Sequence, residues 1–169
     1  NISQIIKQQE EGFVLYSKGL TNIPLPGHIK HTNPDGFYHI KYGHIPKDDF
    51  WVIKIAGGPH NLPINGLMLA ISTISGQPEF LLQDNGYLTA LRTAVAGLIS
   101  AKYLANKEIR AIGVIGTGLQ ARMQVQLLTY LTNCKTIYVW GRCDNKLNLY
   151  KNDMTKNGFD VSITNDVSI

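Results

Sequence analysis

Six residues near the middle of the chain form a glycine-rich pattern that is typical of dinucleotide phosphate sites. The segment Gly116-Thr117-Gly118-Leu119-Gln120-Ala121 matches G-x-G-x-x-A. The first glycine permits a tight turn, the second lets the backbone approach a pyrophosphate, and the last small residue allows close packing of a helix on a strand. A helix beginning here would direct N–H groups and its positive dipole end at the phosphates. The pattern predicts cofactor binding, with a purely structural turn as the alternative.

Arg142 stands where such domains discriminate between the two nicotinamide dinucleotides. Domains that prefer NAD usually carry an Asp or Glu after the second strand, which binds the ribose 2′-hydroxyl. This chain has Trp140-Gly141-Arg142 at that place. The guanidinium could pair with a 2′-phosphate, so the sequence slightly favours NADP over NAD. A solvated loop arginine is the alternative interpretation.

Two further cations are candidates for binding an anionic group. Arg92 lies beside Thr93 in an alanine-rich stretch with few acidic neighbours. Its guanidinium could project into a cleft and bind a carboxylate or phosphate, or it could form a buried structural ion pair. Lys54 has apolar neighbours on both sides in a β-rich run, where it could face an anion or water. Periodicity alone favours the surface for Lys54.

The remaining reactive residues and the charge balance argue against several other classes of protein. The five histidines form no metal-ligand pattern, and Cys134 and Cys143 lack a paired ligand spacing, so we expect neither a metal site nor a disulfide framework. The net charge of +4 arises from 16 Lys and Arg against 12 Asp and Glu spread along the chain, which does not indicate nucleic-acid binding. No apolar run suits a membrane span or signal peptide, so we expect a cytoplasmic protein without membrane contact.

The elements that must position these residues begin with a β-rich half. Short β-forming runs at residues 13–15, 37–42 and 50–55 are separated by turn residues, and two more strands are expected at 66–75 and 78–82 around a turn at 75–78. One long helix is predicted over residues 87–105, with Asp84 or Asn85 as its cap.

The second half alternates strands and helices around the glycine turn. Strands are predicted at residues 111–115, 136–140 and 159–163, with an amphipathic helix and a polar helix between them. This β-α-β-α-β order predicts a parallel sheet.

The fold class is therefore α/β, with two domains. Residues 1–106 are expected to form a mostly antiparallel sheet domain for substrate binding and dimerisation, and residues 107–169 the first half of a Rossmann-type parallel-sheet domain. A complete doubly wound domain needs on the order of 150 residues. The chain also starts without Met, and residues 165–169 follow a strand-like segment without a stop signal. We therefore expect a fragment with both domains incomplete.

Three segments resemble the ornithine cyclodeaminase and mu-crystallin family in their order and spacing. They are Leu88-Thr89-Ala90-Leu91-Arg92-Thr93-Ala94, then Ala101-Lys102-Tyr103-Leu104-Ala105, then Gly113-Val114-Ile115-Gly116-Thr117-Gly118-Leu119-Gln120-Ala121. The resemblance runs from about Pro24 to Arg142. It implies a sheet domain that holds the substrate and the dimer contact, and a Rossmann domain that holds NAD or NADP.

The resemblance also implies roles for individual residues. It assigns Lys54 and Arg92 to the substrate carboxylate, and Thr93 with Gly116 to Ala121 to the cofactor. The implied chemistry is hydride transfer at the Cα–N bond of an amino or imino acid, as in cyclodeaminases, amino acid dehydrogenases and ketimine reductases. A mu-crystallin-like protein that binds NAD(P)H without turnover is the alternative.

Some residues depart from the family's pattern. In the family that this chain resembles, members that use ornithine carry an arginine where Pro26-Gly27-His28 stands here. They also carry an acidic residue near the position of Lys41, which suits a second substrate amine. Lysine at that place indicates a different substrate. The family's catalytic aspartate belongs to a later part of the Rossmann domain, so this chain is expected to be inactive on its own.

Overall fold

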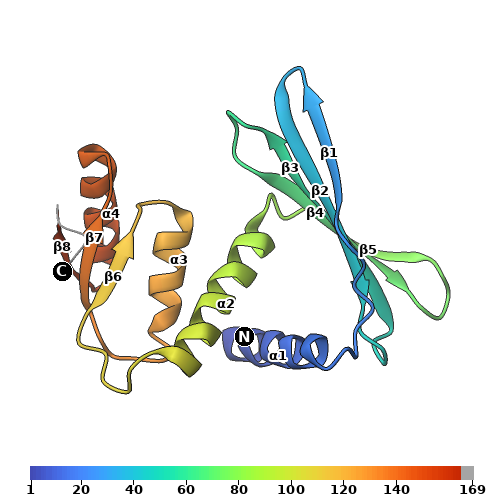
Figure 1. The fold of residues 1–169 in the computed structure, drawn as a ribbon, viewed down its shortest axis with the longest axis horizontal. Helices are drawn as coiled ribbons and strands as arrows, with labels where there is room; N and C mark the ends of the chain where they lie inside the picture. Colours follow the sequence, from blue (N-terminus) through green and yellow to red (C-terminus); the bar gives the residue numbers. More distant parts are fainter. Residues whose placement is uncertain (165–169) are drawn as a thin grey trace. The chain divides into compact units, whose positions relative to one another are not determined.

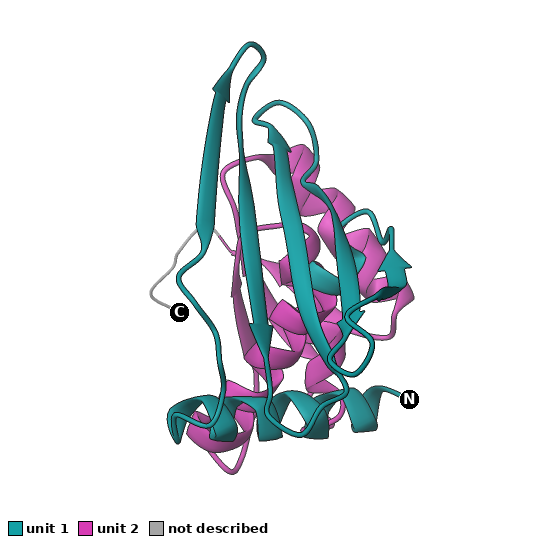
Figure 2. Ribbon diagram, turned by 90° about the vertical axis from the view of Figure 1, so that its right-hand side faces the viewer, with its two compact units in different colours: residues 1–89 teal, residues 90–169 magenta. Residues whose placement is uncertain are grey.

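The computed structural model describes residues 1–164, and these fall into two compact units (Figure 2). Unit 1 comprises Asn1–Thr89, and unit 2 begins at Ala90. The long helix α2 (Tyr87–Leu104) therefore lies mostly in unit 2. The sequence analysis places this helix before a functional boundary at residues 106 and 107, and that boundary remains a prediction. The segment 165–169, used above to expect a fragment, lies outside the described residues.

Unit 1 is built on a five-stranded antiparallel sheet in the order β1-β2-β3-β4-β5 (Figure 1). Its strands are β1 (Gly27–Thr32), β2 (Asp35–His44), β3 (Phe50–Pro59), β4 (Asn65–Ser72) and β5 (Pro78–Leu82). The predicted antiparallel sheet is thus confirmed. The strand expected at 66–75 ends earlier, at Ser72, because Gly76 at φ +73° turns the chain toward β5.

Two predictions for the start of the chain are corrected by the structure. Phe13-Val14-Leu15 is not a strand, because it continues helix α1 (Ile2–Ser17), whose cap Asn1 accepts a hydrogen bond from the Ser3 N–H at 3.1 Å. A run of three β-formers is too short to override a helix already begun upstream. Strand β1 was not predicted, because the edge sequence Gly-His-Ile-Lys-His-Thr has only one large apolar residue.

The predicted cap of α2 is confirmed. The Asp84 carboxylate accepts a hydrogen bond from the Leu88 N–H at 2.5 Å, and the Asp84 carbonyl accepts one from the Tyr87 N–H. Gly86, at φ +82°, makes the turn that leads into the helix. This cap fixes the first turn of α2, which carries Thr89.

Strand pairing divides the unit 1 sheet into two chemically different faces. Residues that stand directly opposite each other in an antiparallel pair point to the same side. One side, which we call the basic face, carries the cations and histidines His28, Lys30, His39, Lys41 and Lys54 beside apolar residues such as Phe37, Val52, Met68 and Leu82. The other side, the apolar face, carries aromatic and aliphatic residues on every strand: Ile29, Tyr38, Tyr42, Trp51, Ile53, Ile55, Leu67, Leu69, Ile71 and Leu81.

Unit 2 contains a parallel sheet in the order β6-β7-β8, as the alternating pattern predicted. Its strands are β6 (Ile112–Ile115), β7 (Thr136–Trp140) and β8 (Asp160–Ile163), and its helices after α2 are α3 (Leu119–Leu128) and α4 (Asp144–Lys156). This is the arrangement of the first half of a Rossmann-type domain. Consecutive strands are neighbours, so the carboxyl ends of β6 and β7 lie side by side.

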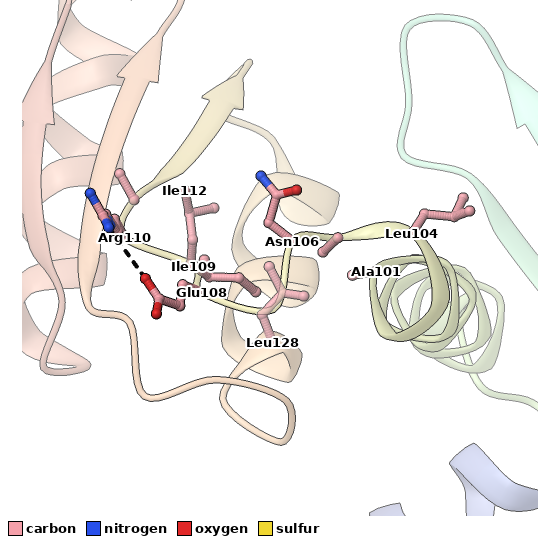
Figure 3. A pocket seen from close by; sticks show the side chains of 10 residues that line it. Ala101, Leu104, Asn106, Glu108, Ile109, Arg110, Ile112 and Leu128 are labelled. Atoms are coloured by element: carbon pink, nitrogen blue, oxygen red, sulfur yellow. Dashed lines mark hydrogen bonds and ion pairs between the residues drawn. The ribbon is translucent and has the colours of Figure 1, made fainter.

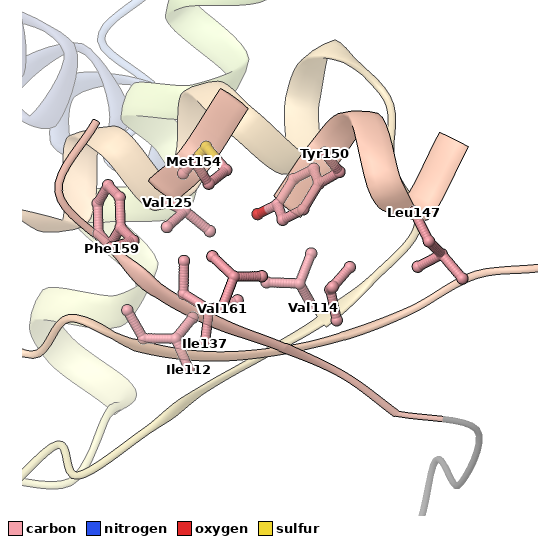
Figure 4. Close-up of a cluster of buried hydrophobic side chains, with 10 residues drawn as sticks. Ile112, Val114, Val125, Ile137, Leu147, Tyr150, Met154, Phe159 and Val161 are labelled. Carbon is pink, nitrogen blue, oxygen red and sulfur yellow. The ribbon is translucent and has the colours of Figure 1, made fainter. Parts of the chain in front are cut away.

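The core of unit 2 is formed between one face of this sheet and helices α3 and α4 (Figure 4). Ile137 and Val139 of β7 and Tyr150 and Met154 of α4 are fully buried, at 0% exposure. Alternate residues of β6 and β7 supply the sheet side of this core, as period-2 burial requires. The core fixes α3 against β6, and with it the turn that joins them.

Within residues 1–164 no helix has the combined length and hydropathy that a membrane crossing requires.

Candidate functional site

The glycine turn lies at the carboxyl end of β6, which is where open parallel sheets bind ligands. Gly116 donates its N–H to the carbonyl of Trp140 at 2.8 Å, which joins the turn to the end of β7. The Thr117 methyl group lies close to Gly141, because a Cβ built on that glycine would meet it at 3.3 Å. Two contacts therefore hold the turn against the end of β7.

The backbone conformation of the turn gives different reasons for its two glycines, Gly116 and Gly118. Gly116 has φ +105°, a conformation that favours glycine by itself. Gly118 has an ordinary φ of −81°, and a Cβ placed there would meet no atom within 4 Å. Among residues 1–164, no neighbouring atom therefore requires a glycine at 118. A group approaching the backbone from outside, such as a pyrophosphate, would require it.

Helix α3 begins directly after this turn and presents its amino end there. Gly118 is the N-cap and provides no side-chain hydrogen bond to the first turn. The first N–H groups of a helix have no partner within the helix, and they carry the positive end of its dipole. Residues 119–121 are thus suited to bind phosphate oxygens. Gln120 turns its side chain away from this role and donates to the Ala90 carbonyl at 3.0 Å.

Arg122 supports the turn, and the sequence analysis did not identify it. Its guanidinium donates to the carbonyls of Thr117 and Gly118 and forms an ion pair with Asp153 of α4 at 2.8 Å. An arginine immediately after the G-x-G-x-x-A pattern is the only sequence signal, and the partner Asp153 is 31 residues away.

Tyr150 of α4 is buried and contacts two residues of α3. Its hydroxyl donates to the Ala121 carbonyl at 3.2 Å, and the Arg122 guanidinium lies 5.0 Å from its ring centroid. Burial raises the pKa of Tyr150 to about 12, and the positive charge of Arg122 opposes part of this rise. The side chain is therefore a neutral hydrogen-bond donor at physiological pH.

Arg142 lies two residues beyond the end of β7, in the short loop before α4. Because β6 and β7 are parallel with Ile115 opposite Trp140, this loop and the glycine turn share one edge of the sheet. Arg142 is exposed there. The structure thus places Arg142 and the glycine turn at the same edge, as a 2′-phosphate contact would require.

Lys54 lies in unit 1, whereas Arg92 and Thr93 of α2 lie in unit 2, so they are described separately. In unit 1 the Lys54 ammonium donates to the Thr89 hydroxyl at 3.1 Å, so this lysine is half-buried and directed toward the start of α2. In unit 2 Arg92 is exposed on α2, and Thr93 follows it with intermediate exposure. The roles of Lys54, Arg92 and Thr93 in ligand binding remain predictions.

A hollow of about 730 Å³ in unit 2 lies at the opposite end of the sheet from the glycine turn (Figure 3). Leu104, Ile109 and Leu128 line it, and Ile112 marks the amino end of β6. An exposed ion pair between Glu108 and Arg110, at 3.2 Å, also lines it. Dinucleotides bind at the carboxyl ends of parallel strands, so this hollow is not a candidate cofactor site.

Among the described residues, no group of three or more histidine, cysteine or acidic side chains is arranged to bind a metal ion.

Comparison with known proteins matches the chain to one protein family and to several relatives. The model of the ornithine cyclodeaminase/mu-crystallin family matches residues 1–168. An uncharacterized cyclodeaminase of Sinorhizobium fredii is 34% identical over 128 residues, which cover 71% of this chain and 39% of that protein. The alanine dehydrogenase of Archaeoglobus fulgidus is 32% identical over 139 residues, covering 76% of this chain and 40% of that protein.

Two solved structures show the same fold. A Thermococcus litoralis Δ1-pyrroline-2-carboxylate reductase, in complex with NADH and L-proline, aligns with a TM-score of 0.88 at 24% identity over 99% of this chain and 54% of its own. An archaeal alanine dehydrogenase dimer with bound NAD aligns with a TM-score of 0.87 at 24% identity over 97% of this chain and 52% of its own. The chain spans about half the length of these structures and about two fifths of the two curated relatives.

Proposed function

The chain belongs to the ornithine cyclodeaminase/mu-crystallin family, and we propose that it binds NAD or NADP at the glycine turn for hydride transfer at the Cα–N bond of an amino or imino acid. The observation that carries this proposal is Gly118, whose ordinary φ and open surroundings leave a close-approaching ligand as the reason for a glycine. Residues Gly116 to Ala121 would hold the pyrophosphate, and Thr93 would assist them.

The choice of cofactor depends on Arg142. An exposed guanidinium at the turn's edge of the sheet supports NADP, because it can form a charge-assisted pair with a 2′-phosphate. The two structural relatives, by contrast, were solved with NADH and with NAD. We propose that this chain accepts both cofactors with a modest preference for NADP.

We assign the substrate carboxylate to Lys54 and Arg92. The match of residues 1–168 to the family model supports this assignment. Two cations on one carboxylate would fix the substrate Cα for reaction. A bound nicotinamide would supply the hydride exchange that interconverts the amine and the imine.

The cations would bind the carboxylate alike in the ground state and the transition state. Lys54→Ala or Arg92→Ala in the whole protein should therefore mainly raise KM, with a smaller loss of kcat from misorientation. Steady-state kinetics on the substrate found by screening test this expectation. Unaltered kinetics for Lys54→Ala would contradict the assignment.

A panel of amino acids with NAD and NADP, and of 2-oxo acids with ammonia and the reduced cofactors, tests the proposed reaction itself. Turnover is measured from the absorbance of the reduced nicotinamide. Cofactor binding without turnover of any member by the whole protein would favour the alternative, a mu-crystallin-like binding protein. Cyclisation with loss of ammonia would be expected only for diamino acids, and it would identify a cyclodeaminase.

We also propose a homodimer formed through the apolar face of unit 1. Ile29 is 53% exposed and Leu81 57% exposed on this face, and burial of such residues stabilises association. The relative described as an alanine dehydrogenase dimer supports the same state. Sedimentation velocity on wild type and Leu81→Asp tests it, and a wild-type monomer at micromolar concentration would refute it.

A further inference from the structure

Two glutamines of α3 connect this helix to α2 within unit 2 (Figure 1). The Gln120 Nε2 donates to the Ala90 carbonyl at 3.0 Å, and the Gln124 Nε2 donates to the Gln120 Oε1 at 3.2 Å. A carbonyl can only accept, so the amide nitrogen of Gln120 faces Ala90 and its oxygen remains for Gln124. We call these two hydrogen bonds the glutamine bridge. Both are part-buried, which strengthens them relative to bonds in water.

The backbone of α2 approaches this bridge closely. Ala90, Ala94 and Gly97 follow one another at intervals of four and three residues, which places them on one face of the helix. A Cβ built on Gly97 would meet the Gln124 Oε1 at 2.6 Å, which is closer than a side chain tolerates. Gly97 does not have a positive φ, so the space taken by Gln124 gives the reason for a glycine at this position.

The bridge contacts α2 near its amino end, where Thr93 lies three residues after Ala90. The chain passes from α2 to the sheet of unit 2 at the opposite end of the helix, after Leu104. Residues 90–104 span about 21 Å at the helical rise per residue. Small side chains such as that of Ala94 interlock little with a neighbouring helix, so they fix the position of α2 along its axis only weakly. A directional hydrogen bond near Ala90 fixes it more strongly.

We propose that Gln120 is a positioning residue, whose side chain holds the amino end of α2, and with it Thr93, beside the glycine turn. This inference rests on the proposed function, in which Thr93 assists the turn in binding the cofactor. Gln120 also lies in the first turn of α3, where backbone N–H groups have no partner within the helix. Its backbone therefore serves the pyrophosphate, while its side chain serves the helix that carries Thr93.

A double-mutant cycle separates positioning from direct contact with the cofactor. Gln120→Met keeps an uncharged side chain of similar length and removes the donor to Ala90, and Thr93→Val removes only the hydroxyl. Isothermal titration of NAD and NADP into the whole protein should show about fivefold weaker binding for Gln120→Met, because fewer molecules have Thr93 in place. In the Thr93→Val background the same substitution should change the affinity little. Additive losses would overturn the proposal, since Gln120 would then act without Thr93.

The other two glutamines of α3 supply a second variant and a matched control. Gln124 lies about 9 Å along the helix from Gly118, too far to touch a pyrophosphate at the turn. Gln124→Met should still weaken binding, by less than Gln120→Met, because the Gln120 amide loses the bond that orients it. Gln126 lies six residues after Gln120, on another side of the helix, so Gln126→Met should bind like wild type. Equal affinities of the Gln124 and Gln126 variants would overturn the proposal.

Stability measurements distinguish positioning from a purely structural role. Urea unfolding followed by Trp140 fluorescence measures how much each variant destabilises unit 2. If Gln120→Met lowered the free energy of unfolding but bound both cofactors like wild type, the bridge would be only structural, and the proposed function would stand without this inference. If wild type bound neither NAD nor NADP, the proposed function would be refuted, and the positioning role with it.

Discussion

The two sheets differ in what covers their apolar residues. In unit 2, Ile137 and Val139 are completely buried under α3 and α4. In unit 1, apolar residues of the sheet such as Tyr42 and Leu81 remain 39% and 57% exposed. The parallel sheet therefore has its own core on one face, whereas residues on both faces of the antiparallel sheet remain partly exposed. Burial of its apolar residues stabilises the parallel sheet, and binding of a ligand or partner should stabilise the antiparallel sheet.

The largest difference between the two sheets is expected in how much a core substitution lowers the stability of each unit. Ile137→Ala should lower the free energy of unfolding of unit 2 by about 2–5 kcal/mol, because it leaves a cavity in a close-packed core. Leu69→Ala, on the apolar face of unit 1, should cost less, because that side chain is already partly exposed.

The two tryptophans allow each unit to be followed alone. Trp51 belongs to unit 1 and Trp140 to unit 2. Urea unfolding followed by fluorescence, in Trp51→Phe and Trp140→Phe backgrounds, measures the two losses separately. Equal destabilisation by Ile137→Ala and Leu69→Ala would contradict the contrast between the two sheets.

A second prediction separates the loops of unit 2 from its core. Arg142→Ala should weaken NADPH binding by about 1.5–3 kcal/mol, because it removes a charge-assisted contact with the 2′-phosphate. NADH binding should change little, and stability should not change, since Arg142 is exposed. Fluorescence titration with both cofactors measures the effect. An equal loss for NADH and NADPH would show that Arg142 has another role.

The last prediction of this comparison concerns the stability of unit 2 at high pH, where Tyr150 loses its proton. Its pKa is raised from 10.0 to about 12 in the folded protein, mainly by burial. The unfolded chain therefore loses this proton first, and the stabilisation, which is complete below pH 10, should be lost as the pH rises from 10 to 12. Unfolding of unit 2 followed by Trp140 fluorescence measures it. Tyr150→Phe should lack this alkaline component, and an unchanged pH profile in that variant would count against the assignment.

The same contrast explains which parts of the structure were predictable from sequence. Strands 78–82 and 136–140 and the cap at Asp84 were predicted correctly, because periodicity and local hydrogen bonding decide them. Strand β1 was missed because an edge strand gains its pairing from β2 and needs little apolar content of its own. Residues 13–15 were predicted wrongly because the helix that includes them is set by a cap twelve residues earlier.

The residues of the candidate site likewise divide into those that the sequence predicts and those that it does not. The glycine turn was visible in the sequence, because its spacing is local. Arg122 was not, because its function depends on Asp153, which only the packing of α4 brings close.

Titration of NADH and NADPH into wild type and two glycine variants tests the central claim most directly. Gly118 and Gly113 both have space for a side chain, since a Cβ at either position meets no atom within 4 Å. Both valine variants should therefore fold, but only Gly118 lies at the turn where the pyrophosphate would approach. Gly113→Val should bind both cofactors like wild type, and Gly118→Val should bind neither. Wild-type affinity of Gly118→Val for NADH and NADPH would contradict it.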